Sequence, residues 1–227
     1  MKVTTDACLF GAWIAKKDNS DPDSYREKDK NVLDIGTGTG LLSLMYAQEN
    51  SGSIIDAIEI DKESYKQAKE NVAASPWSNR VNVLEGDVKT FSFTKKYDLI
   101  ISNPPFYEKE LKSADQRKNI ALHDEALSLE ELLTIIEKNS SPEGIFSLLL
   151  PYKRMEEIKK ILEEWHILQI TLVRQSTRHD YFRIMLTGEV KKENAGETMI
   201  DEIAIWNDNQ QYTPEFTELL KDYYLYL

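Results

Sequence analysis

Residues 31–60 read NVLDIGTGTGLLSLMYAQENSGSIIDAIEI, and this stretch decides the fold class. Asn31–Ile35 is a short apolar run typical of a buried strand. Leu41–Gln48 favours a helix, and Ser53–Ile60 is rich in the β-branched residues that favour a second strand. A strand, a glycine-rich turn, a helix and another strand predict a βαβ unit, in which the two strands lie parallel in one sheet.

The alternation of strand and helix patterns continues towards the C-terminus. It predicts an α/β fold with a mostly parallel seven-stranded sheet, helices on both faces, and an antiparallel edge hairpin made by the last two strands. The further strands expected are Val81–Leu84, Tyr97–Ser102, Ile145–Leu150, Leu168–Val173 and Tyr181–Val190. The further helices expected are Asp61–Ala73 with Asp61 as N-cap, one from Ser128 with a capping box to Glu131, Tyr152–Trp165, and one from Thr213-Pro214.

The length of 227 residues fits a single domain. We expect an N-terminal segment and loop over residues 1–30, a core over 31–190, and a C-terminal strand and helix over 191–227. Lys16–Asn31 is polar, charged and interrupted by Pro22, so it predicts an exposed loop before the first strand.

Composition narrows the function classes. No apolar run reaches the roughly 18–20 residues that span a bilayer, and Met1–Ala15 lacks the pattern of a secretory signal. Cys8 is the only cysteine, which agrees with a reducing compartment, so we expect a cytoplasmic protein. We also expect a monomer. The net charge of −11 opposes a broad nucleic-acid-binding face, because phosphate contacts need Lys and Arg. A local basic face remains open.

The turn after the first strand, Asp34-Ile-Gly36-Thr-Gly38-Thr-Gly40, is a candidate ligand site. Glycines allow a sharp turn and a close approach of ligand to backbone, and the helix that follows offers its N-terminus to an anionic group such as a carboxylate. A dinucleotide fingerprint would need glycine where Leu41 stands. The acidic Asp34 suits a cationic ligand better than a pyrophosphate.

Two carboxylates follow the next strands. Glu59 lies 23 residues after Gly36, where it can accept hydrogen bonds from both hydroxyls of a ribose. Asp87 follows the third strand and can accept from an adenine amino group. Taken alone, the glycine-rich turn would also fit another kind of nucleotide site, and Glu59 and Asp87 would also fit solvent-exposed acids in loops. Their order and spacing resemble the cofactor site of the Rossmann-like class I methyltransferases, which implies S-adenosylmethionine as the cofactor.

Asn103-Pro104-Pro105-Phe106 follows the apolar strand Tyr97–Ser102 and gives the candidate catalytic residues. Two prolines end a strand and fix the orientation of the Asn103 side chain and the Pro104 carbonyl. Two such acceptors can bind both N–H groups of a planar amino group and direct its lone pair at a methyl donor. Phe106 offers a flat face for stacking. The alternative interpretation is that the motif is only a rigid loop after the strand, with Phe106 packed in the core.

The resemblance extends over nearly the whole chain. It rests on Met1–Asp6, Leu9–Trp13, the glycine loop, Asn71-Val72, Ser75-Pro76-Trp77, Ile100–Phe106 and Tyr212–Leu225. These segments look like the bacterial tRNA (adenine-N6)-methyltransferases that modify the adenine just 3′ of the anticodon in a valine tRNA. Membership implies a tRNA anticodon stem-loop as partner and the adenine at position 37 as the methylated base.

The resemblance also implies which residues hold the cofactor. An N-terminal lid segment would cover its methionine part. The expected contacts are Lys2, Thr5, Asp6, Asp34, Gly36, Thr37, Gly38, Gly40, Glu59, Ile60, Asp87, Val88 and Asn103. Two departures stand out: members of the family carry a further segment before Met1, and Leu122 stands where an arginine is expected before His123.

Three other functions remain open. A protein glutamine N5-methyltransferase would use the same Asn-Pro-Pro motif and would tolerate the acidic charge, but such enzymes carry a helical domain before the core. A DNA adenine methyltransferase would need an additional target-recognition domain. The third alternative is a module that binds the cofactor but has little activity, because the short N-terminus would leave the lid incomplete.

The histidines point to no metal site, whereas three arginines are candidates for binding phosphate. His123, His166 and His179 lack metal-ligand spacing with acids or with Cys8, so no metal site is expected, and His166 is interpreted as structural. Arg174, Arg178 and Arg183 surround the loop of the late hairpin and are the candidates for a phosphate-binding patch.

Overall fold

The computed structural model describes residues 3–19, 30–105, 127–163, 165–190 and 196–227. Of the residues singled out above, Lys2, Phe106, Leu122 and His123 lie outside these ranges, as does most of the expected loop Lys16–Asn31. The expectations placed on them therefore stay predictions.

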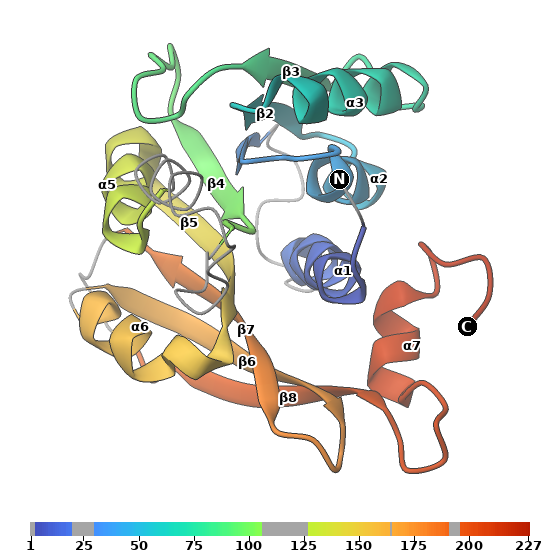
Figure 1. The fold of residues 1–227 in the computed structure, drawn as a ribbon. Coiled ribbons are helices and arrows are strands. Elements are labelled where there is room, and N and C mark those ends of the chain that lie inside the picture. Colours follow the sequence, from blue (N-terminus) through green and yellow to red (C-terminus); the bar gives the residue numbers. More distant parts are fainter. Residues whose placement is uncertain (1–2, 20–29, 106–126, 164, 191–195) are drawn as a thin grey trace, which may run out of the picture.

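A single eight-stranded sheet runs through the molecule (Figure 1), with the order β3-β2-β1-β4-β5-β7-β6-β8. Neighbouring strands from β3 to β5 are parallel, β7 is antiparallel to both β5 and β6, and β8 is parallel to β6. The strands are β1 (Asn31–Ile35), β2 (Ile54–Glu59), β3 (Val81–Glu85), β4 (Tyr97–Ser102), β5 (Ser140–Pro151), β6 (His166–Ser176), β7 (Tyr181–Glu189) and β8 (Met199–Trp206).

The sheet corrects the expected strand count from seven to eight, and the hairpin β6–β7 is not at the edge because β8 lies beyond it. Within β8, the residues Met199 to Glu202 are exposed and Ile205 is buried. β8 lies within residues 191–227, where a C-terminal strand is expected, but an edge strand with so little buried surface carries no clear apolar alternation, so neither its bounds nor its place in the sheet could be predicted.

Helices cover both faces of the sheet, as Figure 1 shows. One face packs against α1 (Thr5–Asn19), α2 (Leu41–Glu49), α3 (Lys62–Ala73) and α7 (Pro214–Leu220), and the other against α5 (Leu129–Asn139) and α6 (Met155–Leu162). The central strands are therefore apolar on both faces: in β1, Val32 belongs to the first core and Leu33 to the second.

Helix α1 extends into the region expected to be a loop. Leu9, Phe10 and Ala12 have no exposed surface, and the helix packs against α2 and α7. A Cβ on Gly11 would lie 2.6 Å from Sδ of Met45 in α2, so glycine permits the close approach of the two helices. Burial of this face stabilises a helix that the polar sequence after Ala15 does not favour by itself.

The expected helix signals are confirmed. Asp61 caps α3 by accepting from Ser64 N, and Ser128 and Glu131 form the capping box of α5. Thr213 caps α7 by accepting from Phe216 N, and Pro214 lies in the first turn of this helix, as expected. The boundaries of other elements differ. β5 begins at Ser140, before the expected strand Ile145–Leu150, and its register against β4 shifts between Tyr97 and Leu99. A short 3-10 turn, Tyr152–Arg154, precedes α6, which ends at Leu162.

No helix in the described part of the chain is long and apolar enough to cross a membrane.

Candidate active site

The loop between β1 and α2 takes a conformation that only glycine adopts freely. Gly36, Gly38 and Gly40 have φ values of 70°, 60° and 82°, in the left-handed region. The backbone N–H groups of Gly36 and Thr37 donate to the carbonyl of Ile58 in β2, which fixes the loop to the sheet. A Cβ on Gly36 would meet no atom of the described residues within 4 Å, so these residues leave open space at this position.

Asp34 is completely buried beneath this loop. Its Oδ2 accepts hydrogen bonds from Thr37 Oγ1 at 2.6 Å and from Ser43 Oγ at 2.7 Å. Its Oδ1 has no hydrogen-bond partner among the residues that the structure describes. Burial raises the pKa of Asp34 to about 6, although the hydrogen bonds from Thr37 and Ser43 lower it. A buried carboxylate oxygen without a partner indicates a site that a cationic group would complete.

Glu59 connects the glycine loop to the start of α3. Its carboxylate is almost fully buried, with Oε2 accepting from Gly38 N at 2.8 Å and Oε1 from Asp61 N at 2.9 Å. Each carboxylate oxygen can accept a further hydrogen bond. The side chain thus holds the loop in place and keeps acceptor capacity for a ligand.

The turn after β3 places Asp87 at the same edge of the sheet. Its Oδ1 accepts from Lys89 N at 2.9 Å and its carbonyl from Phe91 N at 2.9 Å, and the residue is half-buried. Val88 is half-buried beside it, whereas Ile60, which follows Glu59, is 60% exposed.

The Asn-Pro-Pro motif begins where β4 ends, directly beside the glycine loop. Ser102 pairs with Ile35 in the sheet, and Ser102 Oγ donates to the Ile35 carbonyl at 2.8 Å. The next residues in the two strands are Asn103 and Gly36. Asn103 is half-buried, Pro104 buried and Pro105 exposed. The structure therefore brings the first three motif residues and the glycine loop together at the carboxyl ends of two neighbouring strands.

The N-terminal candidates lie on α1. Thr5 is exposed at the start of the helix. Asp6 accepts a hydrogen bond at 2.7 Å from Nε of Arg183 in β7, and its side chain is 13% exposed. Sequence spacing gave no signal for this ion pair, because its partners are 177 residues apart.

The arginines around the late hairpin are each paired with a carboxylate. Arg174 pairs with Glu202 and stacks over Tyr181, and Arg178 pairs with Asp208 at 3.2 Å. With Arg183 bound to Asp6, the positive charge of all three is offset locally. The phosphate-binding patch expected from these arginines is therefore not a patch of net positive charge.

His166 lies at the amino end of β6, at the opposite edge of the sheet from Asn103, where its Nδ1 is 3.1 Å from Glu189 Oε2. Across the described ranges, no group of three or more His, Cys, Asp or Glu side chains could hold a metal ion.

Two solved structures with a similar fold are described as methyltransferases. A protein described as a predicted O-methyltransferase from Agrobacterium tumefaciens superposes with a TM-score of 0.70 over 95% of both chains, at 18% identity. A SAM-dependent methyltransferase from Aquifex aeolicus gives a TM-score of 0.59 over 83% of this chain and 94% of its own, at 14% identity. This likeness confirms the Rossmann-like class I methyltransferase fold.

Relatives of higher sequence identity carry one and the same name. Residues 22–141 match the family model of the methyltransferase small domain. The tRNA1(Val) (adenine(37)-N6)-methyltransferase of Dyadobacter fermentans is 41% identical over 99% of this chain and 91% of its own length. The protein of the same name from Yersinia enterocolitica is 35% identical over 99% of this chain and 86% of its own. The chain belongs to the family of the tRNA1(Val) (adenine(37)-N6)-methyltransferases.

Proposed function

We propose that this chain transfers a methyl group from S-adenosylmethionine to N6 of an adenine in tRNA, at position 37 beside the anticodon of a valine tRNA, as the names of its relatives state for them. The observation that carries the proposal is the junction of the Asn103-Pro104 turn with the glycine loop at the ends of β4 and β1. A donor held by the loop would present its methyl group to a base held by Asn103.

The residues at the carboxyl edge fit the cofactor. The free oxygen of Asp34 suits a cation, because S-adenosylmethionine carries a sulfonium and an ammonium group. The open space at Gly36 accepts a ligand against the backbone, and Glu59 has lone pairs left for ribose hydroxyls. When bound, the cofactor supplies an electrophilic methyl group on sulfur.

The other candidate contacts complete this proposed site. Asp87 would accept from the adenine amino group, with Ile60 and Val88 as apolar contacts for the ring. The proposed contacts at the methionine part are the loop residues Thr37, Gly38 and Gly40 and the N-terminal Lys2, Thr5 and Asp6. The ion pair with Arg183 would hold Asp6 and the start of α1 against the sheet.

Asn103 and Pro104 act on the substrate. Asn103 Oδ1 and the Pro104 carbonyl accept from the two N–H groups of the adenine amine, which orients its nitrogen lone pair. With the cofactor bound, this orientation would direct the lone pair at the electrophilic methyl group on sulfur, and the extra proton on nitrogen would leave to solvent after transfer. No strong base is needed, because the gain comes from positioning and fixed dipoles.

Replacement of Asn103 by Ala tests this role. We expect turnover on tRNA to fall by roughly 100-fold or more, because an oriented acceptor is lost at the reacting nitrogen. The dissociation constant of S-adenosylmethionine, measured by calorimetry, should stay within about twofold, since few cofactor contacts involve this side chain. Asn82→Ala is the matched control: Asn82 lies in β3 and bonds to Asp56, away from the carboxyl edge. Full turnover by the Asn103 variant would remove this residue from the mechanism.

A protein glutamine amide is the second candidate substrate, because it presents the same planar NH2 group and the net charge of −11 disfavours RNA. Incubation with labelled S-adenosylmethionine, bulk tRNA and a peptide-release factor separates the two. Label on RNA alone supports the proposal, whereas label on a protein glutamine alone overturns it. Bound cofactor with no label on either substrate would favour the cofactor-binding module.

A further inference from the structure

A polar pocket of about 460 Å³ lies between the β6–β7 turn and the loop from β8 to α7. It is separate from the glycine loop and from the Asn-Pro-Pro turn. Residues of both loops line it, among them Gln175, Arg178, His179, Trp206, Asn207 and Gln210. The cofactor and the target base, as proposed above, leave this pocket without a role.

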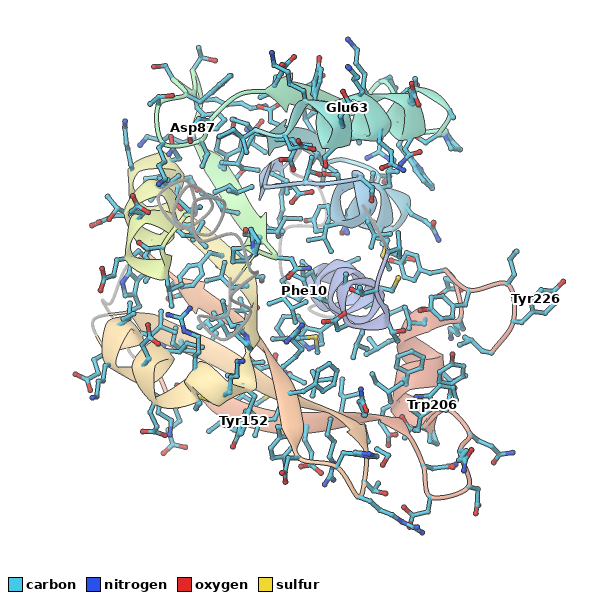
Figure 2. All side chains as sticks on the ribbon, viewed as in Figure 1. Phe10, Glu63, Asp87, Tyr152, Trp206 and Tyr226 are labelled. Atoms are coloured by element: carbon cyan, nitrogen blue, oxygen red, sulfur yellow. The ribbon has the colours of Figure 1, made fainter. Side chains whose placement is uncertain are left out.

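The pocket has a rigid aromatic wall. Trp206 stacks on Tyr212, with ring centroids 4.1 Å apart and an interplanar angle of 20°, and Tyr212 stacks on Phe216 at 4.7 Å and 16°. Phe216 is fully buried, so the stack is anchored in the core beside α7, where Figure 2 shows Trp206. Trp206 is 37% exposed and lines the pocket, whereas Tyr212 does not. The ring face away from Tyr212 is thus available to a planar ligand.

The polar wall offers groups that recognise the edge of a base. Gln175 and Gln210 are exposed, and within the described chain their side-chain amides have no hydrogen-bond partner. Asn207 Oδ1 accepts from the backbone of Asn209 and Gln211, which holds its amide in place. Arg178 is 73% exposed and paired only at the surface with Asp208, so it can exchange this partner for a phosphate at low cost.

The pocket lies at the same edge of the sheet as the catalytic turn. Because β4, β5, β6 and β8 run in the same direction, their carboxyl ends meet at one edge (Figure 1). β8 is four strands from β4 in the order β4-β5-β7-β6-β8, which gives an offset across the sheet of roughly 19 Å at the usual strand spacing. Through the strand pairings, Ser102 of β4 lies level with Ile200 of β8, so Trp206 lies a further six residues, or roughly 20 Å, along the strand direction. An extended single-stranded RNA segment of several nucleotides spans the two offsets together.

We propose that this pocket binds one unpaired nucleotide of the RNA substrate, with its base stacked on Trp206 and its edge read by the amides of Gln175 and Gln210. The inference rests on the proposed tRNA substrate and adds a second anchor for the loop that presents the target adenine. Recognition of splayed, single-stranded bases by aromatic side chains and amides is how proteins read RNA loops. Such an anchor needs little positive charge, which agrees with the paired arginines at this edge.

Trp206→Ala, Trp206→Phe and Gln175→Ala test the pocket, with Met199→Ala as the matched control. Met199 is 62% exposed at the amino end of the same strand, β8, across the sheet from the pocket. Each variant is assayed for methylation of an unmodified valine tRNA transcript and for binding of S-adenosylmethionine. We expect Trp206→Ala to raise the KM for RNA by roughly 5- to 150-fold, the usual effect of losing one base stack. Trp206→Phe should raise the KM for RNA less than Trp206→Ala does, because a phenylalanine ring can still stack on a base. Gln175→Ala should raise the KM for RNA by a few-fold.

The cofactor dissociation constant should be unchanged in all four variants, which shows that the core is intact. A second series replaces single loop nucleotides of the transcript by abasic residues. One position should weaken binding of the wild-type protein and leave binding of Trp206→Ala unchanged. If wild-type turnover on tRNA is clear and Trp206→Ala keeps its KM, the nucleotide site is wrong while the proposed function stands. If the wild-type protein methylates no RNA, the proposed function falls, and the nucleotide site falls with it.

Discussion

Asp34 is buried with one of its carboxylate oxygens lacking a partner, and desolvation raises its pKa to about 6. The same group ionises near 3.8 in an unfolded chain. Between these pH values the folded chain holds a proton that the unfolded chain has lost, so stability falls as pH rises through this window. The ionised form costs up to roughly 3 kcal/mol above pH 6, which a cationic ligand would offset.

Asp34→Asn removes this pH dependence. The free energy of unfolding of the variant, relative to wild type, should rise as pH increases from about 4 to about 6, as the pKa of Asp34 requires. Denaturant titrations of the cofactor-free protein at several pH values measure it. Binding of S-adenosylmethionine should weaken, since the neutral amide no longer attracts its cation. A constant stability difference over this window would contradict the role of desolvation.

Glu59→Ala should weaken S-adenosylmethionine binding by roughly 10- to 150-fold, the usual effect of losing hydrogen bonds to a charged acceptor. The carboxylate also holds Gly38 N and Asp61 N, so thermal stability should fall as well. Glu85→Ala is the control, because Glu85 ends the neighbouring strand opposite Glu59 but is exposed. An unchanged cofactor affinity in the Glu59 variant, measured by calorimetry, would exclude this residue from the site.

The positions of Asp34, Glu59 and Asn103 could be predicted from the sequence, because each is fixed by the end of an apolar strand. Two properties could not be predicted. The missing partner of Asp34 Oδ1 depends on how Thr37 and Ser43 turn their hydroxyls, and the Asp6–Arg183 pair joins residues 177 positions apart. Both follow from tertiary packing rather than from local pattern.

Helices and strands could be predicted from the sequence where residues close together in the chain mark their ends. The capping box at Ser128 and the cap at Asp61 mark helix starts by hydrogen bonds within a few residues. Local patterns indicated no bounds for β8, whose exposed edge position leaves no apolar alternation, and they missed the second half of α1, whose polar sequence follows a buried apolar half. In both cases the neighbouring element, β6 or α2, supplies the stabilising contacts.

Gly188→Ala tests the packing between the sheet and its second core. Gly188 in β7 lies opposite Phe146 of β5, and a Cβ there would lie 2.6 Å from Phe146 Cζ and 3.0 Å from the His166 carbonyl. Because this region is buried on both sides, we expect a loss of about 1–3 kcal/mol in the free energy of unfolding, measured in urea. Gly196→Ala, where a Cβ would meet no atom within 4 Å, should change stability little. Equal stabilities of the two variants would contradict this packing.

The molecule as a whole concentrates its candidate functional groups at one edge of one sheet. The glycine loop, Glu59, Asp87, the Asn-Pro-Pro turn and the Trp206 pocket lie at the carboxyl ends of β1, β2, β3, β4 and β8, which all run in the same direction. The net charge is −11, and Arg174, Arg178 and Arg183 around the late hairpin are each paired with a carboxylate. Binding of RNA would therefore depend on base contacts more than on phosphate contacts.

The most direct test of the central claim is the identity of the methylated nucleoside. Unmodified valine tRNA is incubated with the protein and labelled S-adenosylmethionine, digested, and its nucleosides are separated by chromatography with mass detection. We expect label in N6-methyladenosine, and loss of this label when the adenine 3′ of the anticodon is replaced. Label in any other nucleoside, or none in RNA from protein that binds the cofactor, would contradict it.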